Sequence, residues 1–300
     1  MTIPITVCEV GPRDGLQNEA RALAPATRAE LVRRLAATGL PVIEAGSAVR
    51  DDRVPQMAGL EAVVRDAAPA QSPACELAVL VMNGRGLERA LSTRAHGVHV
   101  AYPVTDAFAR HNQGADAATA AVEARRIADE ARAAGRSATI TLAAALGCPF
   151  AGEVDPGLVA VRAAEAATSA DVVVLADTIG AATPRALRAL ISAVRRATPV
   201  RLGVHLHNTR NAGYANAVAA LEAGVDWFDA SVGGFGGCPF APGATGNVAT
   251  EDLAWILERE GARPGLDLDA LGAAGAWLGD QLGRPVPGLL HRAGPFPAAA

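Results

Sequence analysis

The chain has 300 residues, half of them hydrophobic and 19% charged, with a formal net charge of −4. This composition supplies a large core, and the mild acidity offers no basic surface for nucleic acid or an anionic membrane. No apolar run approaches the ~18 residues of a spanning helix, and the first residues lack the basic and apolar regions of a signal peptide. We therefore expect a protein with a small-molecule partner and no nucleic-acid or membrane partner.

Every cation counted under lysine and arginine is an arginine, because the sequence contains no lysine. Schiff-base, pyridoxal-phosphate and P-loop chemistry all need a lysine and are excluded. Aldolase-type chemistry in this chain would have to use a metal or acid–base catalysis. The four cysteines, Cys8, Cys75, Cys148 and Cys238, show no paired spacing, so we expect a reducing, cytoplasmic location.

Short apolar runs alternate with longer segments of helical period along the chain. The predicted strands are Ile5–Val10, Val42–Ala45, Leu77–Val81, Gly97–Tyr102, Ala138–Ala143, Val172–Ala176, Arg201–His205 and Trp227–Ala230. The predicted helices between them include Thr27–Ala37, Ala115–Ala134, Pro184–Ala197 and Asn211–Ala223. This alternation predicts parallel βαβ units, and eight units in about 260 residues favour a closed barrel over an open sheet.

The fold class is therefore predicted to be α/β, a (β/α)8 TIM barrel with a short C-terminal helical extension. No linker of glycine, serine or proline divides the chain, so residues 1–300 are expected to form a single domain. The extension is expected to cover about residues 265–300, with one or two helices followed by a tail.

Polar side chains occur where the predicted strands end, which is where a TIM barrel carries its functional groups. His205 and His207 lie two residues apart on a strand, so their side chains point to the same side. Asp14, after the first strand, adds an anionic oxygen, and Asn247, after the eighth, adds a neutral one. A mixed nitrogen and oxygen set suits Mg²⁺ or Mn²⁺ better than structural zinc, although zinc and cobalt stay open.

Each of these residues also has a purely structural interpretation. An isolated His-x-His pair is more often hydrogen-bonded in a polar rim, and Asp14 in Arg-Asp-Gly fits a turn. Asp177 fits a helix N-cap as well as a partner that orients a metal ligand. Cys148, which follows the fifth strand, has no role that the sequence decides.

A glycine-rich segment follows the eighth strand, with four glycines in Gly233–Gly237 and then Cys238. It does not stand at the head of a βαβ unit, so dinucleotide binding is not expected. So many glycines predict a loop able to close over a site. Cys238 could act there as a general acid or base once a cation and Arg13 bias its pKa.

Five ordered motifs resemble the 3-hydroxy-3-methylglutaryl-CoA lyase family of the DRE-TIM metallolyase superfamily. They are V-C-E-V-G-P-R-D-G-L-Q-N-E near the N-terminus, Val54–Met57, Ala145–Phe150, Ala176–Gly180 and Gly236–Leu253. The resemblance extends from about residue 5 to about residue 285. It implies a TIM barrel that cleaves an acyl-CoA, and association as a homodimer.

The resemblance also implies roles for individual residues. A divalent cation, Mg²⁺ or Mn²⁺, would be held by Asp14, His205, His207 and Asn247. Arg13 would stabilise the enolate on the thioester carbonyl, Cys238 would be the catalytic cysteine of the loop, and Asp14 would belong to the catalytic set. Arg13, Gln17 and Glu44 would contact the substrate. The expected reaction is retro-Claisen cleavage of 3-hydroxy-3-methylglutaryl-CoA, or of a related 3-hydroxyacyl-CoA, to acetyl-CoA and a ketone or keto acid.

Three segments depart from the family pattern. They are His207–Arg210, the stretch Thr139-Ile140-Thr141-Leu142 where the family places an arginine and an aromatic residue, and Ser47–Asp52. Loss of a positive contact for the distal carboxylate would favour a different 3-hydroxyacyl group. Two alternatives to a lyase stay open: a Claisen-condensing acyltransferase of the isopropylmalate-synthase type, and a non-catalytic barrel.

Overall fold

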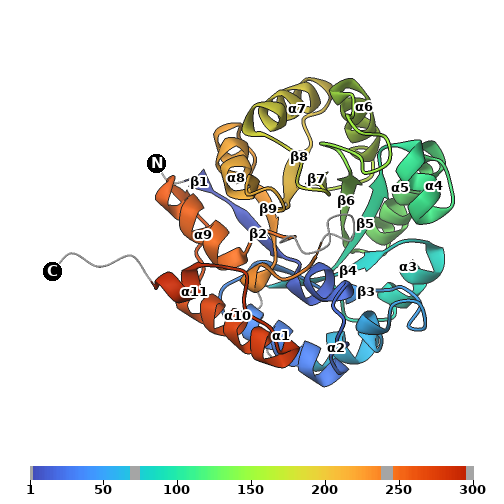
Figure 1. Cartoon of the computed structure of the whole chain (residues 1–300). Helices are drawn as coiled ribbons and strands as arrows, with labels where there is room; N and C mark the ends of the chain where they lie inside the picture. Colours follow the sequence, from blue (N-terminus) through green and yellow to red (C-terminus); the bar gives the residue numbers. More distant parts are fainter. Residues whose placement is uncertain (1–2, 68–74, 238–245, 295–300) are drawn as a thin grey trace.

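The computed structural model describes residues 3–67, 75–237 and 246–294. Eight parallel strands close into a barrel with helices around it, which confirms the predicted TIM barrel (Figure 1). The barrel strands are β2 (Thr6–Glu9), β3 (Val42–Ser47), β4 (Glu76–Val81), β5 (Gly97–Pro103), β6 (Ser137–Ala143), β7 (Val172–Asp177), β8 (Arg201–Leu206) and β9 (Trp227–Ala230). Each coincides with one of the eight strands predicted from the sequence, with ends that differ by a few residues.

The strands form where the sequence is apolar and rich in β-branched residues, because both of their faces are buried. Every residue of β3 and of β7 is buried. Strands β5 and β6 pair along their whole length, from Gly97 with Ser137 to Pro103 with Ala143. Since side chains alternate along a strand, alternate residues of these two strands point into the barrel side by side.

The helices follow the strands and pack against the outside of the barrel through apolar faces. They are α1 (Pro25–Ala36), α2 (Leu60–Ala67), α3 (Gly84–Leu91), α4 (Asp106–Gln113), α5 (Ala117–Ala133), α6 (Pro156–Ala166), α7 (Pro184–Ala197), α8 (Gly213–Glu222) and α9 (Thr250–Arg259). The predicted helix Ala115–Ala134 corresponds to α5, and α4 before it was not predicted. The two are separate helices because Gly114 ends α4 with a left-handed backbone, φ 71°.

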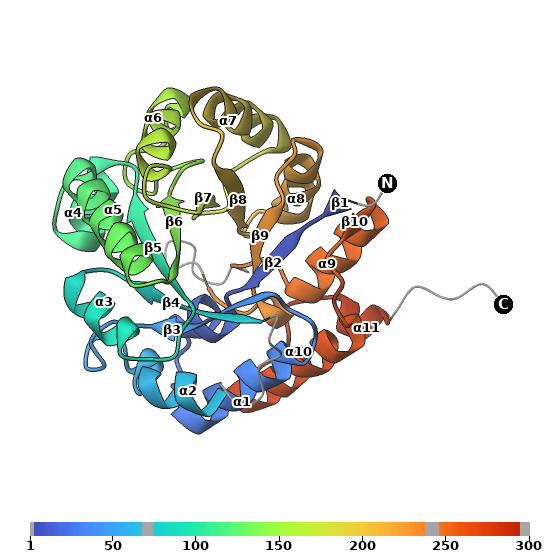
Figure 2. The ribbon, with the colours of Figure 1, turned by 180° about the vertical axis from the view of Figure 1, so that it is seen from behind.

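The C-terminal extension consists of α10 (Leu268–Leu282) and the short α11 (Leu290–Ala293). Helix α10 packs against α1 and α9, and both views show it beside α1 (Figure 1, Figure 2). Two short strands outside the barrel, β1 (Ile3–Pro4) and β10 (Ala262–Arg263), pair in parallel. Among the described residues, no helix combines the length and apolar character that crossing a membrane requires.

Candidate functional site

A cavity of about 220 Å³ lies at the carboxyl ends of the barrel strands. Six of the residues singled out in the sequence line it: Arg13, Asp14, Gln17, Glu44, His205 and His207. They come from segments that are far apart in the sequence, and the closure of the barrel brings them together. Polar groups that converge on a largely preformed hollow are typical of a ligand site.

Asp14, His205 and His207 form a group whose potential ligand atoms all lie within 4.8 Å of one another. The Nε2 atoms of the two histidines are 3.2 Å apart, and His205 Nε2 is 3.8 Å from a carboxylate oxygen of Asp14. Two imidazole nitrogens and one carboxylate oxygen this close together fit a divalent cation.

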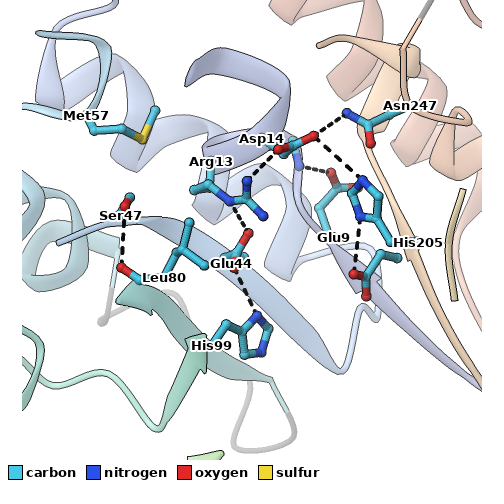
Figure 3. A network of polar contacts seen from close by, with 12 residues as sticks. Glu9, Arg13, Asp14, Glu44, Ser47, Met57, Leu80, His99, His205 and Asn247 are labelled. Atoms are coloured by element: carbon cyan, nitrogen blue, oxygen red, sulfur yellow. Dashed lines mark hydrogen bonds and ion pairs between the residues drawn. The ribbon is translucent and has the colours of Figure 1, made fainter. Parts of the chain in front are cut away.

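Asn247 joins this group through the backbone and the side chain. It forms an isolated antiparallel bridge with His207, so two predicted ligands from separate segments are paired. Its amide Nδ2 donates to Asp14 Oδ2 at 2.9 Å (Figure 3). The same Nδ2 donates to the Phe235 carbonyl at 3.2 Å. One residue earlier, the Gly246 carbonyl accepts the Asn208 N–H at 2.7 Å. The structure thus places Asn247 beside the group, and its ligation through the amide oxygen stays a prediction.

Asp229 completes the surroundings of His205, and sequence reasoning missed it. Its Oδ2 lies 3.3 Å from His205 Nδ1, and its Oδ1 accepts the Trp227 indole N–H at 2.8 Å. A carboxylate on Nδ1 fixes the tautomer in which Nε2 is free to bind a metal. The signal available in the sequence was the alternation of β9, which places Trp227 and Asp229 on the same face.

Arg13 lies in the short π-helix Gly11–Gly15 that follows β2. Its guanidinium donates to Glu44 and to Asp14, so one cation joins two carboxylates at the cavity (Figure 3). Burial opposes ionisation of Asp14, but the charge of Arg13, followed by that of His205, holds the pKa of its carboxyl well below the usual range. For Glu44, burial also acts to raise the pKa, yet Arg13 and a hydrogen bond from His99 hold it below its ordinary value. Both groups are therefore carboxylates.

The two histidines differ in their electrostatic surroundings. Burial, together with the neighbouring charge of His205, lowers the pKa of His207 to about 4. For His205, burial acts to lower the pKa, but the hydrogen bond to Asp229 and the charge of Asp14 raise it above its ordinary value. His207 is thus neutral near pH 7, the form in which imidazole binds metals.

The remaining sequence candidates have different outcomes. Asp177 accepts the N–H groups of Ala181 and Ala182 at 2.8 and 3.0 Å, in the turn before α7. The N-cap of α7 is Thr183, so the predicted N-cap role of Asp177 is wrong. Cys148 is buried with its Sγ 3.0 Å from Thr105 Oγ1. Cys238 lies outside the described residues, so its part in the site stays a prediction.

Two buried carboxyl groups that the sequence did not reveal hold the backbone near the glycine-rich segment. Glu9 accepts the N–H groups of Gly11 and Val232 at 2.7 and 2.9 Å and the hydroxyl of Thr250 at 2.6 Å. Glu251 accepts the Gly233 N–H at 2.9 Å. Burial raises the pKa of Glu9 to about 7 and that of Glu251 to about 8. These carboxyls fix the start of the segment rather than line the cavity.

Comparison with known proteins gives consistent matches along the chain. The model of the HMGL-like family matches residues 4–277. The chain is 43% identical to an (R)-citramalyl-CoA lyase of Chloroflexus aurantiacus, covering 97% of this chain and 95% of the relative. It is 40% identical to a hydroxymethylglutaryl-CoA lyase of Pseudomonas mevalonii, covering 93% of each.

Solved structures agree with the sequence relatives. The fold superposes on a hydroxymethylglutaryl-CoA lyase from Pseudomonas aeruginosa with a TM-score of 0.93 and 38% identity, covering 98% of both chains. An HMG-CoA lyase from Acinetobacter baumannii, in complex with coenzyme A and 3-methylmalate, gives a TM-score of 0.89 and 32% identity, again covering 98% of both. The chain therefore belongs to the hydroxymethylglutaryl-CoA lyase family of the DRE-TIM superfamily and is an enzyme of that type.

Proposed function

We propose that this protein is a divalent-metal-dependent carbon–carbon lyase that cleaves a 3-hydroxyacyl-CoA into acetyl-CoA and a keto acid. The observation that carries the proposal is the group of Asp14, His205 and His207 beside Arg13 at the cavity, in a chain of the hydroxymethylglutaryl-CoA lyase family. The cation would be Mg²⁺ or Mn²⁺, held by these three residues and Asn247. When bound, it would supply Lewis acidity that makes the substrate hydroxyl easier to deprotonate.

The chain's own residues account for the rest of the reaction. Cys238 as a thiolate, the proposed base, would take the hydroxyl proton. The C–O bond then becomes a carbonyl while the C2–C3 bond breaks, and its electron pair passes to the thioester as an enolate. Arg13, held by Glu44 and Asp14, places a fixed positive charge where the negative oxygen develops. Protonation of the enolate carbon then gives acetyl-CoA, and Cys238 is the proposed proton donor.

We propose the citramalyl group as the first acyl group to test, ahead of the hydroxymethylglutaryl group. The (R)-citramalyl-CoA lyase of Chloroflexus aurantiacus shares 43% of its sequence with this chain. The family's strand arginine is replaced in the stretch that contains Thr139 and Thr141, and the latter lines the cavity. Citramalyl-CoA is one methylene shorter than the hydroxymethylglutaryl thioester, and cleavage would give pyruvate instead of acetoacetate.

The deciding experiment offers a panel of 3-hydroxyacyl-CoA thioesters to the purified protein with Mg²⁺ or Mn²⁺ and identifies the products by mass spectrometry. We expect acetyl-CoA and a keto acid, with no product after chelation of the metal. Condensation of acetyl-CoA with a keto acid to a free hydroxy acid and CoA would instead support the acyltransferase alternative. Absence of turnover in both directions would support a non-catalytic barrel.

We also propose a cytoplasmic location and a homodimer. Among the described residues, Cys8, Cys75 and Cys148 are free thiols, as expected in a reducing compartment. The dimer rests on the family resemblance, and sedimentation or light scattering of the purified protein tests it.

A further inference from the structure

His99 lies in the cavity but has no role in the mechanism described above. It belongs to β5 and is only 8% exposed. Its Nδ1 is 3.0 Å from Glu44 Oε1 (Figure 3). Its ring meets that of Trp227 edge-on at a centroid distance of 6.5 Å. A buried polar side chain held in one orientation at the wall of a cavity is placed to contact a ligand.

The hydrogen bond to Glu44 determines which nitrogen faces the cavity. Glu44 is a carboxylate and can only accept, so Nδ1 of His99 is the donor. The other nitrogen, Nε2, has no hydrogen-bond partner within residues 3–67, 75–237 and 246–294, and it is not sealed from solvent. The ring therefore presents Nε2 to whatever occupies the cavity.

Nε2 of His99 is the basic atom at the described cavity wall that has no assigned partner. The described lining contains three carboxylates, on Asp14, Glu44 and Asp229. The single guanidinium, that of Arg13, is already bound to two of them. His205 and His207 belong to the proposed cation group, which leaves His99 as the basic side chain of the described lining that is free to bind an anion.

The register of the barrel relates His99 to the altered strand. His99 on β5 pairs with Thr139 on β6, so the two side chains lie next to each other on the inner face. The next pair, Ala101 and Thr141, lines the cavity above them. The imidazole thus stands beside the position where β6 carries a threonine.

We propose that His99 is a specificity-determining residue whose Nε2 binds the carboxylate in the keto-acid half of the substrate. The inference rests on the proposed lyase function and narrows it to 3-hydroxyacyl thioesters that carry a free carboxylate near the hydroxyl-bearing carbon. Glu44 holds the imidazole in place. A ring that takes up a proton together with the anionic substrate would donate from Nδ1 to Glu44 and from Nε2 to the substrate carboxylate.

The test compares two substrates that differ only in this group. Citramalyl-CoA carries a carboxylate where 3-hydroxy-3-methylbutyryl-CoA carries a methyl group. In His99→Val we expect kcat/KM for citramalyl-CoA to fall about 10- to 100-fold, mainly through KM, because a hydrogen bond to a charged group is lost. For the methyl analogue we expect less than about a threefold change. His99→Gln, which keeps an N–H donor, should recover part of the loss.

His96→Asn is the matched control, because His96 precedes β5 at the opposite end of the barrel from the cavity. Its ring nitrogen Nδ1 accepts the Leu77 N–H, and the side-chain oxygen of asparagine can accept the same bond. Equal losses on both substrates in His99→Val, or no loss on either, would overturn the inference.

A binding measurement separates failure of the inference from failure of the proposed function. If the wild-type protein cleaves no thioester of the panel, the lyase proposal fails. Calorimetric titration of the Mn²⁺-loaded protein with pyruvate then still tests His99. We expect His99→Val to weaken pyruvate binding about tenfold or more and to leave binding of neutral pyruvamide unchanged. The proposed role of His99 would be refuted if the wild-type protein bound no pyruvate. It would also be refuted if the wild-type protein and His99→Val bound pyruvate equally well.

Discussion

Asp229→Asn tests whether the carboxylate on His205 sets up the cation group. In the wild-type protein Asp229 Oδ1 accepts the Trp227 indole N–H at 2.8 Å, and Oδ2 lies 3.3 Å from His205 Nδ1. Because the indole is a donor only, it should hold the oxygen of the new amide and turn the NH₂ group toward His205. Nδ1 must then accept, so the ring proton moves to Nε2, the atom that faces Asp14 and His207.

The expected loss of Mn²⁺ affinity in Asp229→Asn follows from the number of ligands that the substitution affects. One of the two imidazole nitrogens would lose its free lone pair, while His207 and Asp14 are untouched. Loss of such an orienting partner costs about 10- to 100-fold in metal affinity. Since each factor of ten is about 1.4 kcal/mol, the expected loss is about 1.4 to 2.7 kcal/mol of Mn²⁺ binding free energy.

The assay is calorimetric titration of metal-free protein with Mn²⁺. Asp226→Asn is the matched control. Asp226 directly precedes β9, at the end of the strand away from the cavity, and its carboxylate accepts from Arg201 at 3.1 Å. Its Mn²⁺ affinity should equal that of the wild-type protein. Unchanged affinity in Asp229→Asn would refute the tautomer argument, and no Mn²⁺ binding by the wild-type protein would refute the cation site itself.

Two further predictions concern the ligands and the buried acids. His207→Ala should lose both bound divalent metal and turnover, and unchanged Mn²⁺ affinity in this variant would contradict the ligand assignment. Cys238→Ala should keep the metal and lose most activity. Burial raises the pKa of Glu251 from its ordinary value of 4.5 to about 8. Between these two pH values the folded protein binds a proton at Glu251 that the unfolded chain does not. The free energy of unfolding therefore falls as the pH rises through this range. Glu251→Gln should therefore reduce the difference in unfolding free energy between pH 5 and pH 8, by about 1 kcal/mol or more, and urea denaturation at both pH values measures it.

The barrel could be predicted from the sequence because its strands are buried on both faces and read as short apolar runs. All eight of those runs correspond to barrel strands. Helix α4 was missed because it has only eight residues and is separated from α5 by a short break at Gly114. A pattern of hydrophobicity does not resolve so short a helix from the longer one that follows.

The candidate site was predictable where its residues occupy strand ends or motifs. Arg13, Asp14, His205 and His207 fall there, and they line one cavity. His99 and Asp229 lie inside strands, and their partners, Glu44 and His205, are remote in sequence. Only the register of the closed barrel brings these groups together. Alternation along β9 places Asp229 on the face of Trp227, but it does not reveal the contact with His205.

The residues on either side of segment 238–245 are held in place, and this has a consequence for engineering and for divergence. Asn247 contacts the Phe235 carbonyl before the segment, and Gly246 accepts the Asn208 N–H after it, so both ends are held by residues of the barrel rim. None of these anchoring residues belongs to the segment itself. The proposed proton donor, Cys238, can therefore be substituted, by design or in evolution, without replacing any residue that is proposed to hold the cation.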